Sequence, residues 1–337
     1  MRVTVKTYDL NLEVPFAIAR GTTAVQRVCI AEIECGGLTG RGEASPSAYY
    51  GDSLDAAAET IRGAEGLLGE DPWSSRDVLD ALATRPRTSP SGRAAISAAL
   101  YDLAGKMAGQ PVFKLLGLAG KPLPPTSFTV GVDDVSLARD RIDTLRKFPL
   151  LKVKVGFGQE EALLDLLSTE TSAKLRVDVN EGWTPDEAIR KIKAWARYSI
   201  EFFEQPLPRK DREGYRRLRD ATDAVIYVDE GVVSARDIPQ WAGLADGINI
   251  KLMKCGGIAE ALDMIATARA AGLGVMLGCL VETSLGISAA AHLAPLADYC
   301  DLDGNLLITN DPFRGVKGTG GVLSLSDLPG LGVTPAQ

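Results

Sequence analysis

The chain has 337 residues, of which 45% are hydrophobic and 24% are charged, a composition typical of a globular protein with a sizeable core. Its 37 lysines and arginines against 44 aspartates and glutamates give a net charge of −7, which argues against nucleic acid or an anionic membrane as the main partner. No stretch approaches the ~18 apolar residues of a membrane span, and the first residues lack the apolar run of a secretory signal. A cytoplasmic protein of about two domains is therefore expected.

Cysteine and histidine are scarce in this chain, which limits the kinds of catalytic and metal sites that it can form. The cysteines number five and form no CxxC pair, so neither a disulfide framework nor a zinc site is predicted. The only histidine, His292, lies in the apolar stretch ISAAAHLAPLA and is expected to be a packed core residue. We therefore expect lysines and carboxylates to carry any catalysis.

The first 122 residues are expected to form an α+β domain. Residues 2–8 and 26–35 alternate polar and apolar side chains as strands do, and a glycine pair directly after the second range marks a hairpin turn. Helices are predicted at about 53–68 and 91–108, where apolar residues recur at helical spacing. The prolines of GKPLPP then mark a domain boundary.

Residues 123–305 alternate regularly between strand and helix candidates. Short β-branched runs occur at 126–131, 150–155, 174–179, 201–205, 224–228, 247–251, 274–278 and 299–303. Eight strands separated mostly by helical segments predict a parallel (β/α) barrel. An open doubly wound sheet is the alternative, but no GxGxxG fingerprint follows an early strand. The last segment, 306–337, is expected to fold back onto the N-terminal domain.

Charged residues recur near the ends of five successive strand candidates. Lys154, Asp178, Glu204, Asp229 and Lys251 follow one another at steps of 24, 26, 25 and 22 residues, so each step is one βα unit. Because the C-terminal strand ends of such barrels carry the active site, these groups are expected to converge at one mouth. Three carboxylates make an all-oxygen site that suits Mg²⁺ better than zinc. A structural ion-pair network explains any single acid, but it explains the ordered set poorly.

Four further residues are candidates for substrate contacts. Lys152 shares a strand face with Lys154, although a solvated face also fits that spacing. Asp301 and Asp303 in YCDLDG are candidates to hold a substrate ammonium, and initiation of a turn is their alternative. Arg20, in a loop of the first domain, is a candidate to hold a carboxylate, and a surface arginine is its alternative.

These segments resemble the enolase superfamily over nearly the whole chain. LLKVKVG, VDVN, FEQP, VDEG and INIKLMKCGG, in that order and spacing, are similar to its muconate-lactonising-enzyme-like subgroup. PFAIARG, GCLVETSLGISAAAHLA and DLDG are similar to the dipeptide epimerases, most of all to those acting on L-Ala-D/L-Glu. Two departures, VDVN where the family usually has D-A-N and VDEG where it has D-E-S, remove neither a metal ligand nor a base.

The resemblance implies an α/β fold and a set of residue roles. The fold is a modified (β/α)7β barrel of the TIM type at 123–305, with an α+β capping domain at 1–122 and a C-terminal segment at 306–337 that returns to the cap. Mg²⁺ is implied as the cofactor, with Asp178, Glu204 and Asp229 as its ligands and Lys154 and Lys251 as the acid/base pair. Thr129, Cys279 and Val281 are implied to line the pocket, and Lys152 to contact the substrate carboxylate.

The implied reaction is epimerisation of a dipeptide at its C-terminal residue through an enediolate. Two lysines on opposite faces permit proton removal from one side and return to the other, provided that nearby cations and desolvation lower their pKa values. Ala-Glu from peptidoglycan turnover is the expected substrate, and a homo-oligomer is left open.

Rival reactions exist within the same subgroup. One rival is a lyase or cycloisomerase, such as o-succinylbenzoate synthase or a muconate-type enzyme, and another is an N-acylamino-acid racemase. Their substrates carry no ammonium group for Asp301 and Asp303 to bind. Sugar-acid dehydratases need a histidine near the seventh strand end, which VMLGCLVET lacks. A non-catalytic binding barrel is disfavoured because no ligand or lysine is missing.

Overall fold

The fold is described from a computed structural model that covers residues 1–18, 21–130, 135–156 and 158–336. The chain begins with three antiparallel strands in the order β1-β2-β3, and their bounds are β1 Arg2–Ile18, β2 Gly21–Cys35 and β3 Leu38–Ala44. Gly36 and Gly37 join β2 to β3 with φ angles of 57° and 81°, which glycine adopts without strain. The hairpin turn is therefore where it was predicted, but β1 runs well beyond the predicted range 2–8.

Helices cover one face of this small sheet. They are η1 Ala48–Tyr50, α1 Leu54–Gly63, η2 Pro72–Ser74, α2 Ser75–Thr84, α3 Pro90–Ala108 and α4 Val112–Leu115. The Ser53 and Ser89 side chains cap α1 and α3 by accepting backbone N–H groups of the first turn. A Cβ on Gly42 of β3 would lie 2.0 Å from the carbonyl oxygen of Ala95, so glycine permits β3 to pack directly against α3. The predicted helices at 53–68 and 91–108 are thus confirmed as α1 and α3.

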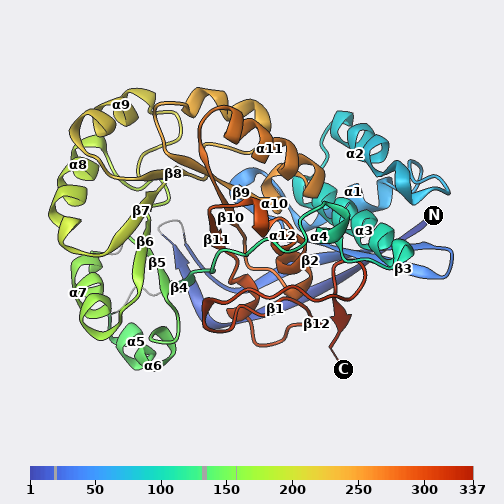
Figure 1. Ribbon diagram of the computed structural model, residues 1–337, viewed down its shortest axis with the longest axis horizontal. Coiled ribbons are helices and arrows are strands. Elements are labelled where there is room, and N and C mark those ends of the chain that lie inside the picture. The colour runs from blue at the N-terminus through green and yellow to red at the C-terminus, as the bar shows by residue number, and fades with distance from the viewer. Residues whose placement is uncertain (19–20, 131–134, 157, 337) are drawn as a thin grey trace.

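The second part of the chain is a parallel barrel (Figure 1). Its strands are β4 Phe128–Val130, β5 Leu150–Lys154, β6 Lys174–Asp178, β7 Ile200–Glu204, β8 Ile226–Val228, β9 Gly247–Lys251, β10 Gly274–Gly278 and β11 Tyr299–Asp301. Each strand pairs with the next in sequence, and a parallel bridge between Thr126 and Cys300 nearly closes the ring. The predicted barrel is therefore confirmed over the open doubly wound sheet.

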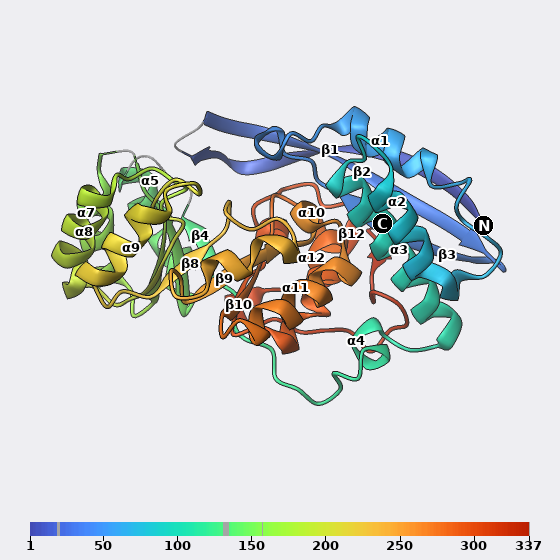
Figure 2. The same ribbon diagram turned by 90° about the horizontal axis from the view of Figure 1, so that it is seen from above.

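Helices and short turns surround the barrel. They are α5 Val135–Asp140, α6 Ile142–Leu145, α7 Glu160–Glu170, α8 Pro185–Ala194, η3 Trp195–Arg197, α9 Arg212–Ala221, η4 Ala235–Asp237, η5 Pro239–Trp241, α10 Leu252–Cys255, α11 Ile258–Ala270, α12 Ser284–Ala291 and η6 Ala294–Leu296. The strands are largely buried because helices pack outside them and a cluster of Phe202, Tyr227 and Met276 packs together within the strand layer. Figure 2 shows α7, α8 and α9 at one end of the molecule and the cap helices at the other.

The last segment lies against the cap and includes η7 Gly304–Leu306, β12 Phe313–Arg314, η8 Thr319–Gly321 and β13 Thr334–Pro335. The backbone N–H of Thr309 donates to the carbonyl of Asn11 at 2.9 Å, and that of Val112 donates to the carbonyl of Gly330 at 2.9 Å. The predicted domain boundaries at 122 and 305 stay a prediction.

His292 is fully buried at the end of α12. Burial lowers its pKa to about 4, so the ring is neutral at pH 7, and its Nδ1 accepts the backbone N–H of Phe113 at 3.1 Å.

Among the described residues, none of the helices has the length and apolar character that a membrane span needs.

Candidate active site

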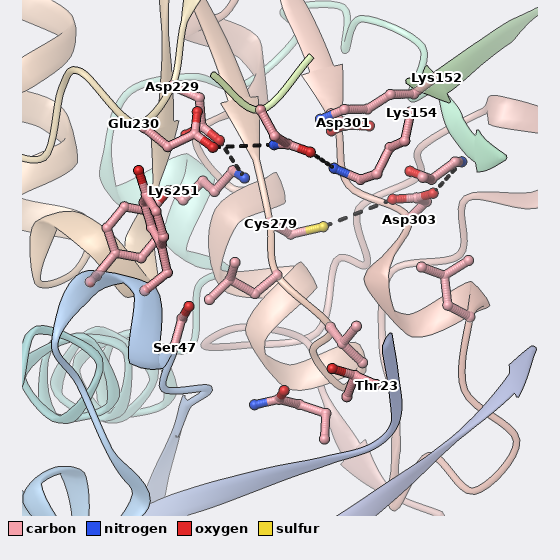
Figure 3. A pocket seen from close by; sticks show the side chains of 18 of the residues that line it. Thr23, Ser47, Lys152, Lys154, Asp229, Glu230, Lys251, Cys279, Asp301 and Asp303 are labelled. Carbon is pink, nitrogen blue, oxygen red and sulfur yellow. Dashed lines mark hydrogen bonds and ion pairs between the residues drawn. The ribbon is translucent and has the colours of Figure 1, made fainter. Parts of the chain in front are cut away.

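A cavity of about 660 Å³ lies between the cap and the C-terminal ends of the barrel strands. The barrel residues that line it include Lys152, Lys154, Asn180, Asp229, Glu230, Lys251, Cys279, Asp301 and Asp303, and the cap contributes Thr23, Gln26, Ser47, Tyr49 and Tyr50. Figure 3 shows Lys251 and Asp229 at one side of this cavity and Lys152 and Lys154 at the other. The charged residues predicted from their spacing therefore meet at one mouth.

Strand register brings the three predicted metal ligands together. Asp178 and Glu204 are the last residues of β6 and β7 and stand opposite each other in the ladder, and Asp229 follows β8 directly. Each of the three is about 1% exposed. Three adjacent carboxylates buried to this extent need compensating cations.

Lysine ammonium groups supply that compensation. The Nζ of Lys152 lies 3.0 Å from Asp178 Oδ2, 2.8 Å from Glu204 Oε2 and 2.7 Å from Asp301 Oδ2. Burial alone lowers the pKa of Lys152, but these carboxylates raise it well above its ordinary value. Lys152 is therefore charged and bridges the acids of three strands.

Lys154 and Lys251 stand on either side of the acids. Lys154 Nζ is 2.8 Å from Asp178 Oδ2, and Lys251 Nζ is 2.9 Å from Asp229 Oδ2. Burial opposes the charge on Lys251, yet the charge of Asp229 raises the pKa of this lysine above its usual range. This direction is opposite to the expected lowering, because the negative charge of Asp229 favours the charged form of Lys251.

Each of the three acids has one oxygen held by a protein donor. The donors are the backbone N–H of Asn180 for Asp178 Oδ1 at 3.1 Å, the side-chain amide of Asn249 for Glu204 Oε1 at 2.8 Å, and the ammonium of Lys254 for Asp229 Oδ1. The other oxygen of each acid faces Lys152, Lys154 or Lys251. These three oxygens, one from each acid and called the inner oxygens below, therefore all face lysine ammonium groups.

The donor set fits a hard divalent cation. Burial and the charge of Asp178 raise the pKa of Glu204 to about 7, and its Oε2 lacks a hydrogen bond although Lys152 is 2.8 Å away. Within the described residues, no three acids, histidines or cysteines already surround a common metal position, and two of the acids contact Lys152 and Lys251. A divalent ion would relieve the undercompensated carboxylate of Glu204.

Lys254 was not identified from the sequence. Besides Asp229 Oδ1, its buried ammonium contacts the carbonyl oxygens of Asp229 at 2.8 Å, Asn249 at 3.0 Å and Val232 at 3.2 Å. Its position three residues after Lys251 in INIKLMKCGG was the available signal.

Gln205 was also missed, and it holds the turn that carries Asp229. Its Oε1 accepts the backbone N–H groups of Asp229 at 2.9 Å and Gly231 at 3.0 Å, and its own φ is 40°.

A Cβ on Gly231 would lie 2.3 Å from Cζ2 of Trp241. The glycine in VDEG, where the family usually has serine, is therefore required by packing against Trp241.

Asp301 and Asp303 occupy different environments at the other side of the cavity. Asp301 pairs with Lys152 and accepts the Ser127 hydroxyl at 2.6 Å, whereas Asp303 accepts the backbone N–H of Thr129 at 2.6 Å. Burial and the charge of Asp301 raise the pKa of Asp303 to about 6. Asp303 lines the cavity and forms no salt bridge within the described residues, so a cation in the cavity could pair with it.

The remaining predicted contacts lie around the cavity, with one exception. Thr129, Cys279 and Val281 line it, and the Cys279 thiol is 4.0 Å from Asp303 Oδ1. Arg20 lies outside the described residues. Tyr49 of the cap lines the cavity and donates its hydroxyl to Glu181, a contact for which the sequence offered no signal.

Both parts of the chain match models of known protein families. Residues 1–117 match the family model of the mandelate racemase / muconate lactonizing enzyme N-terminal domain, and residues 134–337 match the enolase C-terminal domain-like model. The chain is 34% identical to the L-Ala-D/L-Glu epimerase of Bacteroides thetaiotaomicron, covering 99% of this chain and 88% of that protein.

Two further similarities come from Enterococcus faecalis. The hydrophobic dipeptide epimerase of that organism is 35% identical, with 99% of both chains covered. The crystal structure of its dipeptide epimerase complexed with Mg and the dipeptide L-Leu-L-Tyr superposes with a TM-score of 0.92 at 35% identity, covering 98% of each chain.

Proposed function

We propose that the chain is a Mg²⁺-dependent dipeptide epimerase. The premise is its family: the chain belongs to the mandelate racemase / muconate lactonizing enzyme family of the enolase superfamily. The observation that carries the proposal is the placement of Lys154 and Lys251 on β5 and β9, on either side of the acids from β6 to β8. Two opposed lysines suit removal of the α-proton from one face and its return to the other.

Asp178, Glu204 and Asp229 would hold Mg²⁺ through their inner oxygens. The bound ion would supply electrostatic stabilisation of the charge that develops on the substrate carboxylate when its α-proton leaves. Lys152, already fixed among Asp178, Glu204 and Asp301, would contact the same substrate carboxylate. Undiminished turnover after EDTA treatment and dialysis is the result that would refute the metal requirement.

The proton transfers need Lys154 and Lys251 in opposite protonation states at any moment. Lys154 and Lys251 each contact one of the acids that would hold the divalent ion, Asp178 and Asp229, and would exchange protons with opposite faces of the α-carbon. One lysine then accepts the α-proton at its Nζ, and the other donates a proton to the opposite face.

Asp301 and Asp303 favour a dipeptide over an N-acylated substrate. A carboxylate with the raised pKa of Asp303 is stabilised by a cation, and the free α-ammonium of a dipeptide is such a cation. The substrates of the rival lyases and N-acylamino-acid racemases have none. The substrate ammonium would therefore lie near Asp303, across the cavity from Lys251.

For the epimerised residue we propose glutamate, so that the substrate is L-Ala-D/L-Glu from peptidoglycan turnover in the cytoplasm. This rests on Arg20 as the cation for the side-chain carboxylate and on the relative from Bacteroides thetaiotaomicron. A hydrophobic second residue is the second candidate, because Tyr49, Tyr50, Val281 and Leu307 line the cavity.

A library of dipeptides and N-succinyl amino acids, incubated with the protein and Mg²⁺ in D₂O, tests the proposal. Epimerisation incorporates one deuterium at the α-carbon, which mass spectrometry detects, and the most strongly labelled members identify the second residue. Labelling of N-succinyl amino acids in preference to dipeptides would favour the racemase alternative. No labelling of any member would remove the epimerase proposal.

A further inference from the structure

Two buried carboxyl groups meet at the contact between cap and barrel, and neither belongs to the site described above. Glu43 lies in β3 of the cap, and Glu282 lies in the loop between β10 and α12. Their exposures are 1% and 2%. Neither forms a salt bridge within the described part of the chain. A buried acid without a cation is costly, so this pair calls for a physical explanation.

The two groups border the same small space. A Cβ on Gly286 would lie 2.5 Å from Glu282 Oε2 and 3.2 Å from Glu43 Oε2. A side chain at Gly286 would therefore occupy the volume between the carboxyl groups. Two negative charges so placed in a buried environment repel each other strongly, and retention of a proton relieves that repulsion.

Hydrogen bonds distinguish the two members. Glu43 accepts the backbone N–H groups of Thr283 and Gly286, each at 3.0 Å, and the hydroxyl of Thr283. These donors belong to the start of α12, where unpaired N–H groups favour a negative charge. Glu282 accepts one backbone N–H, that of Leu280 at 2.8 Å. Glu43 is thus the better place for the charge and Glu282 for the proton.

We propose that Glu43 carries a negative charge while Glu282 keeps a proton, and that this arrangement lets the hydrogen bonds of Glu43 to Thr283 and Gly286 fasten the cap to the loop that carries Cys279 and Val281. A second cap contact holds the same loop, since the hydroxyl of Ser45 donates to the carbonyl of Val281 at 2.8 Å. The pair thereby acts as a positioning device for one wall of the cavity.

The pKa values agree with this assignment. Burial raises the pKa of Glu43 to about 7 against the donors of α12, and the charge of Asp311 adds to the increase. Burial and the charge of Glu43 raise the pKa of Glu282 to about 8, while the N–H of Leu280 and the charge of Lys251 lower it. Both values exceed that of an ordinary glutamate, so the folded protein binds these protons more tightly than the unfolded chain. The stabilisation is complete below about pH 4.5 and is lost as pH rises through about 7 and 8.

Glu282→Gln tests the pair without substrate or metal. Glutamine keeps the shape of the protonated side chain and cannot ionise, so the thermal midpoint of the variant should fall less than that of wild type as pH rises from about 5 to about 8. At pH 9 the variant should unfold roughly 2–4 °C higher than wild type. Glu65→Gln, at an exposed glutamate of the cap, is the matched control and should follow wild type. Equal pH dependence in wild type and Glu282→Gln overturns the proposal.

Two measurements complete the test. In the infrared difference spectrum against Glu282→Gln, which cancels the absorption of Glu204, the wild-type protein should show a protonated carboxyl group at about pH 7.5 that disappears by about pH 9.5. Its absence from that difference at pH 7.5 overturns the protonation of Glu282. Hydrogen exchange, corrected for intrinsic rates, should show loss of protection in residues 279–291 of wild type over the same range and retention of protection in Glu282→Gln. Equal loss in both proteins shows that the pair does not hold the loop. All three readouts are independent of the proposed epimerase activity.

Discussion

The ammonium of Lys254 in α10 holds Oδ1 of Asp229, whereas Lys251 at the end of β9 contacts the other oxygen, Oδ2. Burial would raise the pKa of Asp229, but the charges of Lys251 and Lys254 lower it below its ordinary value. Because Lys254 also contacts three carbonyl oxygens, rotation of its side chain would break these contacts and leave a buried ammonium without them. It therefore fixes the direction in which Asp229 presents its second oxygen.

Lys254→Met should accordingly weaken Mg²⁺ binding. Methionine keeps an unbranched apolar stem but leaves Asp229 free to turn, and loss of such an orienting partner typically costs ~10–100-fold in metal affinity. Titration calorimetry with Mg²⁺ measures the effect, and thermal unfolding reports any loss of the fold separately. Lys106→Met removes a lysine paired with Asp102 in the cap and should leave Mg²⁺ affinity unchanged. Wild-type affinity in Lys254→Met would show that Asp229 needs no such support.

Asp303 should make dipeptide binding sensitive to pH. Because its pKa is raised to about 6, the carboxyl group loses its charge as pH falls below that value and its attraction for an ammonium weakens. We expect kcat/KM, which reports the free enzyme, to fall up to tenfold per pH unit below about pH 6. Asp303→Asn should lower kcat/KM by about ten- to a hundredfold at pH 8 and remove this pH dependence. An unchanged acid limb in the variant would assign that limb to another group.

Much of the architecture could be predicted because each barrel unit repeats the same local pattern. Each charged residue ends a β-branched run, so one βα step along the chain is one strand around the ring, as Lys154, Asp178 and Glu204 show. The longer β1 could not be predicted, since its extension beyond residue 8 depends on pairing with β2. The roles assigned to these acids and lysines stay predictions, although the structure brings the residues together.

The interactions that were missed join residues with no sequence relationship. Glu43 contacts Thr283 across 240 residues, and no periodicity links them. Lys254 follows Lys251 by three residues in the sequence, but that spacing does not show that its ammonium is buried against Asp229. Side chains that orient other side chains are invisible to pattern analysis, because their function depends on three-dimensional contacts alone.

Gly231→Ser, which restores the usual family residue, should destabilise this protein. The new Cβ would lie 2.3 Å from the Trp241 ring, which is fully buried, and overpacking of this kind costs about 1–3 kcal/mol. Chemical denaturation measures the free energy of unfolding. Gly66→Ala is the control, because a Cβ at Gly66 meets no atom within 4 Å. Wild-type stability of Gly231→Ser would mean that Trp241 moves aside without cost.

Lys154→Ala and Lys251→Ala should each abolish epimerisation. With one lysine left, the α-proton can still be removed from one epimer and replaced by deuterium on the same face, so exchange from a single epimer is expected to survive. Polarimetry follows epimerisation, and mass spectrometry in D₂O follows exchange for each epimer separately. Lys147→Ala, at an exposed lysine, serves as the control. Near wild-type epimerisation by either variant would show that the two-base assignment is wrong.

The last prediction concerns the second residue of the dipeptide. In the described lining of the cavity the cationic groups are Lys152, Lys154 and Lys251, and all three are committed to carboxylates. A glutamate side chain would therefore need a cation from elsewhere, and Arg20 is the candidate that the sequence offers. Its guanidinium can bind a carboxylate through two parallel hydrogen bonds and keeps its charge at every relevant pH.

Arg20→Ala should therefore lower kcat/KM for Ala-Glu about ten- to a hundredfold more than for Ala-Ala or Ala-Met, since a charge-assisted contact contributes roughly 1.5–3 kcal/mol. Steady-state kinetics with the three dipeptides measures the difference, and an unchanged Mg²⁺ affinity would show that the metal site is intact. Arg27→Ala is the matched control, because Arg27 is an exposed arginine of β2 paired with Asp9. Equal losses for all three dipeptides would mean that Arg20 supports the cap rather than the substrate. A wild-type preference for hydrophobic second residues would instead assign selectivity to the wall formed by Tyr49, Tyr50 and Leu307, because burial of an apolar side chain there needs no cation.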